Sequence, residues 1–256
     1  MTKWLASVQS LEEAKTLLPT LPDILDIKNP AQGALGALNI TSVAQIVGLV
    51  SKRCQTSATI GDLPMQAAVI NPAMVAMATS GVDYVKVGLF PDLHLMGCIE
   101  AMAKTIEKLP VPVIAVLFAD KMPNENVMSV LKQSGFQGVM VDTAIKDGRH
   151  LRDHWDQQQI NAFISEAEQY DMLCGLAGAL RYEDIAELKF LGADYLGFRS
   201  ALCQNRERTT QLQADLAVQI QQAMHSAAGQ KAELGCSKKA NSSSVDGLFN
   251  TALRCG

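Results

Sequence analysis

The chain alternates between short runs of apolar residues and longer segments in which apolar residues recur at helical spacing. Eight runs have the length and apolar content of strands buried on both faces: residues 4–8, 24–27, 55–59, 84–87, 113–118, 138–141, 173–177 and 195–198. The intervening and following segments are predicted helices: residues 11–17, 42–53, 72–80, 93–109, 124–133, 157–170, 182–190 and 213–226. Asn71-Pro72, Pro123-Asn124 and Arg181-Tyr182-Glu183-Asp184 are interpreted as helix start signals. The pattern predicts a strand–helix unit repeated along the chain.

Three of the predicted helix-to-strand junctions share one design, a glycine followed by a short turn. Gly81, Gly135 and Gly192 each stand at the end of a helical segment, where a left-handed backbone is common. Eight strand–helix units favour a single (β/α)₈ TIM barrel of class α/β. The structural alternative is a doubly wound open sheet, which needs a glycine-rich turn after its first strand. Val8-Gln9-Ser10 offers no such turn, so we expect the barrel.

Composition then sets the domain organisation and excludes some partners. We expect residues 1–228 to form one catalytic barrel domain and residues 229–256, which are rich in Ser, Lys and Gly, to be a low-complexity, mobile tail. A net charge of -4 disfavours nucleic acid as a partner. There is no apolar run of the roughly 20 residues that span a bilayer, and the beginning of the chain does not resemble a signal peptide. We expect a cytoplasmic homo-oligomer, with six cysteines that remain reduced thiols.

The chemistry-bearing residues gather at the predicted strand ends. In a barrel all these ends open on one face, so residues distant in the sequence become neighbours there. Reading them in order gives Asp26 with Lys28, Thr59 with Asp62, Lys86, Asp120, Asp142 with Lys146, Gly178, and Arg199 with Ser200. A single lysine at such a place is often a surface residue whose stem alone is buried. Three lysines and several carboxylates at one mouth indicate a reactive site.

Crowded amines indicate imine chemistry. A free lysine with a pKa near 10.4 is neutral only about once in 2,500 at pH 7. Burial and neighbouring cations lower a lysine pKa, and Lys28, Lys86 and Lys146 are expected to share one pocket. Asp142 can then hold one lysine charged or move a proton. The residues therefore predict a Schiff-base enzyme acting on an aldehyde or ketone.

The last two predicted strands indicate a phosphorylated substrate. Loops after strands seven and eight of such barrels often bind phosphate through backbone N–H groups. Gly178 allows a close backbone approach, Arg199 offers a guanidinium fork, and Ser200 follows it. A packing role for Gly178 remains an equal alternative. The site as a whole predicts a small phosphorylated carbonyl compound as substrate.

Several stretches resemble the (5-formylfuran-3-yl)methyl phosphate synthase family. They are Asp26-Ile27-Lys28-Asn29-Pro30, Gly33-Ala34-Leu35-Gly36-Ala37, Ser57-Ala58-Thr59-Ile60-Gly61-Asp62, Asp83-Tyr84-Val85-Lys86-Val87-Gly88-Leu89, Val141-Asp142-Thr143-Ala144-Ile145-Lys146-Asp147-Gly148 and Leu176-Ala177-Gly178. The resemblance spans about residues 7–203. It implies a TIM-barrel lyase that makes a furan precursor of methanofuran-type cofactors, in one-carbon metabolism, from two molecules of glyceraldehyde 3-phosphate.

The resemblance also implies roles for individual residues. Lys28 matches the lysine that forms the Schiff base, Lys86 matches the proton acceptor, and Asp142 with Lys146 match the remaining catalytic pair. Asp26, Thr59, Asp120, Gly178, Arg199 and Ser200 are expected to bind substrate or phosphate. Neither a metal nor another cofactor is expected. After Cys203 the chain departs from the glycine-rich family pattern, and Arg206 or Arg208 could replace the backbone donors there.

Two other functions stay open on the sequence. One is a triose-phosphate isomerase or metal-dependent aldolase on the same fold. His150 and His154, four residues apart, could serve as metal ligands, but no third ligand is near and we expect them to be solvated. The other is a barrel without catalytic activity that binds a phosphorylated metabolite within a biosynthetic complex.

Overall fold

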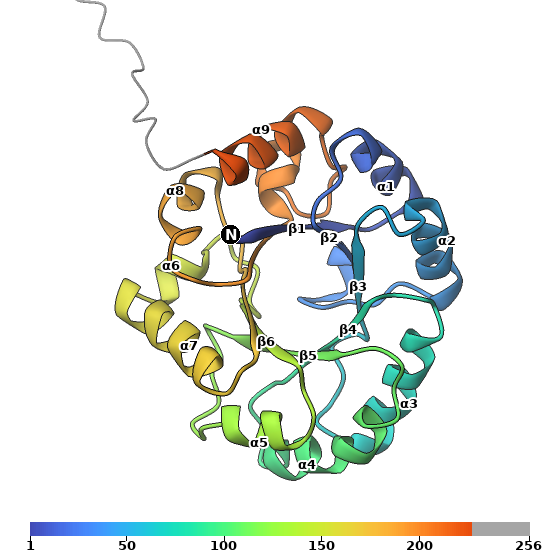
Figure 1. Cartoon of the computed structure of the whole chain (residues 1–256), viewed down its shortest axis with the longest axis vertical. Helices are drawn as coiled ribbons and strands as arrows, with labels where there is room; N and C mark the ends of the chain where they lie inside the picture. Colours follow the sequence, from blue (N-terminus) through green and yellow to red (C-terminus); the bar gives the residue numbers. More distant parts are fainter. Residues whose placement is uncertain (227–256) are drawn as a thin grey trace, which may run out of the picture. The chain divides into compact units, whose positions relative to one another are not determined.

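Eight parallel strands close into a barrel in the order in which they occur along the chain (Figure 1). The structure is a computed structural model and describes residues 1–226. The strands are β1 (Lys3–Val8), β2 (Ile24–Ile27), β3 (Gln55–Thr59), β4 (Tyr84–Gly88), β5 (Val113–Phe118), β6 (Gly138–Asp142), β7 (Leu173–Leu176) and β8 (Tyr195–Phe198). The predicted (β/α)₈ barrel is confirmed, and each predicted strand agrees with the observed one to within one residue at either end.

Helices surround the strands on the outside of the barrel (Figure 1). They are α1 (Leu11–Leu17), α2 (Ile40–Val50), α3 (Ala67–Ala78), α4 (Leu95–Ile106), α5 (Met128–Gln133), α6 (Leu151–His154), α7 (Gln157–Gln169), α8 (Ile185–Leu188) and α9 (Ala214–His225). The region predicted as a helix at residues 182–190 consists of a 3₁₀ turn, Tyr182–Asp184, followed by the single turn of α8.

The start of α3 differs from the prediction. Asn71-Pro72 was expected to begin this helix, but the helix begins at Ala67 and Pro72 lies inside it. Proline in a helix interior removes one backbone hydrogen bond and typically costs about 3 kcal/mol. Ile70, Met74 and Met77 are buried on one face of α3, and this tertiary packing carries the helix through the proline.

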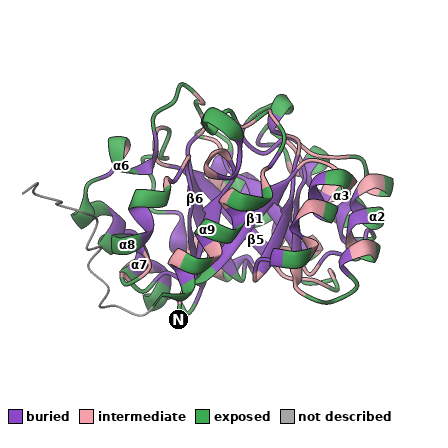
Figure 2. Ribbon diagram, turned by 90° about the horizontal axis from the view of Figure 1, so that it is seen from above, coloured by how far each residue is buried: buried purple, intermediate pink, exposed green. Residues whose placement is uncertain are grey.

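The barrel has two apolar cores. The larger lies between the strands and the surrounding helices, and Figure 2 shows buried strands flanked by helices whose outward faces are largely exposed. The smaller fills the inside of the barrel and contains Leu5, Ile114, Phe118, Met140 and Tyr195. Because side chains alternate between the two sides of a strand, every second residue of each strand faces this interior. The polar residues of the site replace apolar ones in that inward-facing set.

Several further expectations concern segments away from the barrel interior. His150 is buried rather than solvated, at 7% exposure, with Asp153 and Asp184 as neighbours. Cys54, Cys98, Cys174 and Cys203 are free thiols. Within residues 1–226 no helix is both long and apolar enough to cross a membrane. The expected tail at residues 229–256, with Cys236 and Cys255, lies outside the described residues.

Candidate active site

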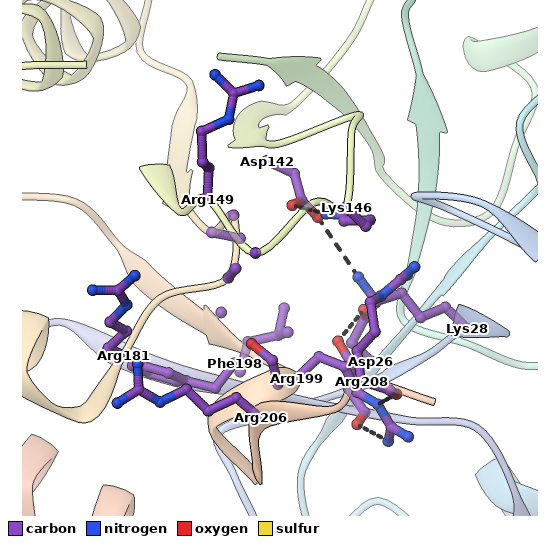
Figure 3. Close-up of a pocket in the computed structure, with 18 of the residues that line it drawn as sticks. Asp26, Lys28, Asp142, Lys146, Arg149, Arg181, Phe198, Arg199, Arg206 and Arg208 are labelled. Atoms are coloured by element: carbon purple, nitrogen blue, oxygen red, sulfur yellow. Dashed lines mark hydrogen bonds and ion pairs between the residues drawn. The ribbon is translucent and has the colours of Figure 1, made fainter. Parts of the chain in front are cut away.

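A pocket of about 260 Å³ opens where the carboxyl ends of β1, β2, β6, β7 and β8 meet (Figure 3). Its lining includes Asp26, Lys28, Asp142 and Lys146, which the sequence placed at strand ends. Lys28 follows β2 directly, Asp142 is the last residue of β6, and Lys146 lies in the loop after β6. Barrel closure therefore brings together residues more than 100 positions apart.

The charged groups of this site form a chain of alternating sign. Lys86 Nζ lies 2.6 Å from Asp26 Oδ1, and Lys28 Nζ lies 3.6 Å from Asp142 Oδ2. Lys146 Nζ donates a hydrogen bond of 2.8 Å to Asp142 Oδ1 and another of 3.1 Å to Thr143 Oγ1. Lys28 also acts electrostatically on Asp26, which links the two pairs. Three ammonium groups and two carboxylates together leave a net positive site, which suits an anionic substrate.

Strand register explains why Asp26 can be buried. In the sheet Asp26 lies opposite Ser7 of β1 and Ser57 of β3, and all three face the barrel interior. Ser7 Oγ donates to Asp26 Oδ2 at 2.9 Å, and Ser57 Oγ donates to Asp26 Oδ1 at 2.7 Å. Two hydroxyl donors and one ammonium thus satisfy a carboxylate with no exposed surface.

Burial and ion pairing shift the pKa values of both carboxylates and of two amines. Burial alone would raise the pKa of Asp26 and of Asp142, but the attraction of neighbouring lysines outweighs it and both pKa values fall below the ordinary range. Burial lowers the pKa of Lys86, and Asp26 only partly opposes it. Burial likewise lowers the pKa of Lys146, with Asp142 opposing and Lys28 adding to the effect. Both carboxylates therefore stay ionised at neutral pH, and Lys86 and Lys146 lose a proton more readily than a free lysine does.

Lys86 lies below the pocket rather than in its wall. It belongs to the middle of β4, and its side chain is 2% exposed. Lys86 instead lines a smaller cavity of about 90 Å³, with Tyr84 and Tyr195, towards the amino ends of the strands. Asp26 lines the main pocket, so it separates Lys86 from a ligand bound there. The three amines form one network, yet only Lys28 and Lys146 are in the lining of the pocket.

Two aspartates hold the loops that follow β2 and β6. Asp62 accepts hydrogen bonds from the backbone N–H groups of Ala34 and Leu35, each 2.9 Å long. Asp120 accepts from the backbone N–H groups of Ala144 and Ile145, each 2.7 Å long. The role expected for Asp120 was substrate binding, but its carboxylate is committed to this loop and is not part of the pocket lining.

Arg199, which was expected to bind phosphate, lines the pocket, but its guanidinium is bonded within the protein. Its guanidinium forms a buried ion pair with Glu13 of α1. The remaining donors reach the backbone oxygens of Ser7, Arg208 and Thr210 at 3.1, 2.7 and 2.9 Å. These bonds occupy the five N–H donors of the guanidinium, so Arg199 has no donor left for a phosphate. Thr59 is likewise buried, donating to the backbone oxygen of Gly36 at 3.0 Å, and does not line the pocket.

Gly178 and Ser200, which were expected to bind substrate or phosphate, line the pocket. Gly178 has φ +102°, and a Cβ at this position would lie 3.1 Å from Thr143 Cγ2 and 3.3 Å from the backbone of Asp142. The glycine therefore allows the turn after β7 to approach the end of β6, where Asp142 lies, closely.

Sequence reasoning missed part of the pocket and its support. Arg149 and Arg181 line the pocket beside the anticipated Arg206 and Arg208, and nothing in their spacing marked them (Figure 3). Glu13, the partner of Arg199, did carry a signal. Ser10 and Glu13 have the Ser-x-x-Glu spacing of a helix N-terminus, and Ser10 caps α1 by accepting from the Glu13 N–H. Among the described residues, no three His, Cys, Asp or Glu side chains are grouped to hold a metal ion.

Comparisons with known proteins identify relatives of the chain. The (5-formylfuran-3-yl)methyl phosphate synthase of Methanococcus aeolicus is 33% identical over 174 residues, which cover 64% of this chain and 74% of that protein. The synthase of the same name from Methanocaldococcus jannaschii is 35% identical over 163 residues, covering 59% of this chain and 69% of that protein.

Solved structures show the same fold at low sequence identity. The 3-hexulose-6-phosphate synthase of Salmonella typhimurium is 16% identical with a TM-score of 0.58, covering 87% of this chain and 98% of that one. The phosphoribosylanthranilate isomerase of Thermotoga maritima is 13% identical with a TM-score of 0.58, covering 88% of this chain and 98% of that one. Residues 4–221 match the family described as 4-HFC-P synthase, and the chain belongs to that family.

Proposed function

We propose that this chain condenses two molecules of glyceraldehyde 3-phosphate into (5-formylfuran-3-yl)methyl phosphate, a precursor of methanofuran-type cofactors. The observation that carries the proposal is the alternating chain of Lys86, Asp26, Lys28, Asp142 and Lys146 at the base of a pocket lined by cations. The overall reaction balances: two triose phosphates give one furan phosphate, one inorganic phosphate and two molecules of water. It involves no net oxidation, so the lysine imine alone can act as the electron sink.

The carbon skeleton of the product supports an enamine step. The phosphomethyl group of the furan is attached to a ring carbon that must be C2 of the triose that keeps its phosphate. That C2 forms the new carbon–carbon bond to a terminal carbon of the second triose. An imine at C1 acidifies the C2 proton, and its removal leaves an enamine whose nucleophilic carbon is C2. Ring closure and dehydration follow, and the second triose loses its phosphate.

The geometry suggests how the residues share this work. Lys28 lines the pocket and has Asp142 as its counter-ion, so its amine can reach the C1 carbonyl. Asp26 is the pocket-lining member of the Asp26–Lys86 pair, and this pair is our candidate for the proton acceptor. Lys146, bonded to Asp142, can protonate a departing hydroxyl or hold the second triose. Each role uses a group that is present in its required charge state or can reach it by moving one proton.

Trapping the imine tests the proposal. Borohydride added with glyceraldehyde 3-phosphate should reduce the imine and leave Lys28 with the mass of one reduced triose that still carries its phosphate. Lys28→Ala should remove the adduct and the furan product while the protein stays folded. Lys52→Ala, at an exposed surface ion pair with Asp83, is the matched control and should be trapped like the wild type. A wild-type protein that remains unmodified would contradict the Schiff-base route.

A further inference from the structure

Arginine side chains occupy two separate ends of the pocket. Figure 3 shows Arg181 and Arg206 on one side and Arg208 on the other, and all three belong to the pocket lining. The lining holds seven Lys or Arg residues and three Asp or Glu residues, and Arg149, Arg181 and Arg199 pair with carboxylates outside the lining. Lys28, Lys146, Arg206 and Arg208 remain to attract the negative groups of a ligand.

Arg208 is fixed beside the reactive amines. Its Nη2 donates to the backbone oxygen of Gly33, after β2, at 2.9 Å, and its own backbone oxygen accepts from Arg199 at 2.7 Å. The other guanidinium donors of Arg208 have no acceptor within residues 1–226. Burial lowers the pKa of Lys146, and the charge of Arg208 is among the neighbours that lower it further. Arg208 therefore presents free donors within electrostatic range of the catalytic amines.

The other end of the pocket has backbone donors as well as arginines. Gly178 and Ala179 are consecutive residues with positive φ values, +102° and +51°. Their N–H groups find no acceptor in the described part of the chain, and both residues line the pocket. Arg206 is exposed and forms no ion pair with any residue that the structure describes. Backbone N–H groups together with a guanidinium form a common type of phosphate site.

We propose that Arg208 forms a second phosphate subsite, so that the pocket holds two phosphate groups at once, one at Arg208 and one at Gly178, Ala179 and Arg206. The inference rests on the proposed function in one respect, since a condensation of two triose phosphates brings two phosphates into one pocket. Arg208 then determines specificity by requiring that both substrates carry a phosphate.

An unreactive ligand with two phosphates tests the subsite. A hexitol 1,6-bisphosphate has six carbons and no carbonyl, so it cannot form an imine. Isothermal titration should show that the wild-type protein binds it at least about tenfold more tightly than glycerol 3-phosphate. The two phosphates belong to one ligand, so once the first is bound the second is already close to its subsite. Arg208→Ala should reduce that advantage to less than about threefold. Arg53→Ala removes an exposed arginine whose guanidinium donates to the backbone oxygens of Leu49 and Val50 in α2, and it should bind as the wild type does.

Three results would overturn the subsite: equal affinity of the wild type for both ligands, an unchanged bisphosphate affinity in Arg208→Ala, or an equal loss in Arg53→Ala. Arg208→Lys keeps the positive charge but loses the paired N–H donors of the guanidinium, so it should bind the bisphosphate with intermediate affinity. This variant tests the subsite if Arg208→Ala does not fold. A different result would reject the proposed function. Tight, Arg208-dependent binding of the bisphosphate without any furan product would leave the subsite standing and reject the condensation.

Discussion

Lys86 and Asp26 form an ion pair inside the barrel, with Lys86 Nζ 2.6 Å from Asp26 Oδ1 and neither side chain more than 2% exposed. Removing one partner of a buried pair leaves a desolvated charge, which is far more costly than replacing both partners. Asp26 therefore contributes to the stability of the barrel interior and also lines the pocket above it.

Asp26→Asn should lower the free energy of unfolding at pH 6 by about 3–5 kcal/mol, because Lys86 loses its counter-ion. Urea titration measures this. Ser57→Ala, which removes only one hydrogen bond to the same carboxylate, is the control and should cost about 1–3 kcal/mol. Equal stability of Asp26→Asn and the wild type would show that the pair does not stabilise the fold.

The same variant should respond to pH with a defined sign. The pKa of Lys86 is already lowered by burial, and without Asp26, which raises it, the pKa must fall further. The native state then binds fewer protons than the unfolded state, so stability rises with pH up to the ordinary lysine range near about 10.4. The stability gap between Asp26→Asn and the wild type should shrink between about pH 6 and pH 9. A gap that widens with pH would contradict this assignment.

Acid should destabilise the protein through Asp142. Burial would raise the pKa of this carboxylate, but Lys146 and Lys28 outweigh burial and lower it. A lowered carboxyl pKa contributes stability that is complete above the unfolded pKa of about 3.9 and is lost as the pH falls towards the folded pKa. Asp142→Asn should therefore lose less stability than the wild type between about pH 5 and pH 3, measured by urea midpoints. Parallel acid profiles would contradict the prediction.

Arg199→Met should destabilise the protein by about 3–5 kcal/mol, since Glu13 would remain buried without its partner. Adding Glu13→Gln should recover part of that loss, because the second change removes the unpaired charge. Thermal melts measure the stabilities. The KM for triose phosphate, measured on the folded fraction of each variant, should stay at the wild-type value, because the guanidinium donors of Arg199 are bonded within the protein. A raised KM without a loss of stability would restore Arg199 as a phosphate ligand.

Gly178→Ala should cost activity as well as stability. Its positive φ makes any side chain strained, by about 1–3 kcal/mol, and the new Cβ would press against Thr143 and Asp142. Gly192 has a similar φ of +100°, but a Cβ there would meet only Ile164 at 3.8 Å. Gly192→Ala should thus lose comparable stability while keeping kcat, whereas Gly178→Ala loses at least about tenfold in kcat. Equal kcat losses in both would show that strain alone, without displacement of Asp142, accounts for the effect.

The fold could be predicted because barrel strands are buried on both faces and read as short apolar runs. Lys28, Asp142 and Lys146 could be predicted because the topology forces all carboxyl strand ends onto one face. The pairing of Arg199 with Glu13 could not, because it joins residues 186 positions apart and depends on how β8 closes against β1.

Local backbone conformation limited the prediction of the arginines. Asn205 and Arg206 have positive φ values of +52° and +58°. The identity of these residues does not predict a left-handed backbone at both positions. These angles shape the segment that carries Arg206 and Arg208, so the sequence could mark both residues as candidates without placing them. The position of Lys86 beneath Asp26 was hidden for a different reason, because residue spacing does not show how far a long side chain extends along the barrel.

The carboxylates of Asp62 and Asp120 accept hydrogen bonds from the backbone of the two loops that carry or flank the pocket lysines. These hydrogen bonds form within the chain and need no ligand. The conformational entropy of the loops is therefore lost once, when the chain folds, instead of at every turnover. The amines are accordingly preorganised, so a substrate that enters the pocket does not have to order these loops itself.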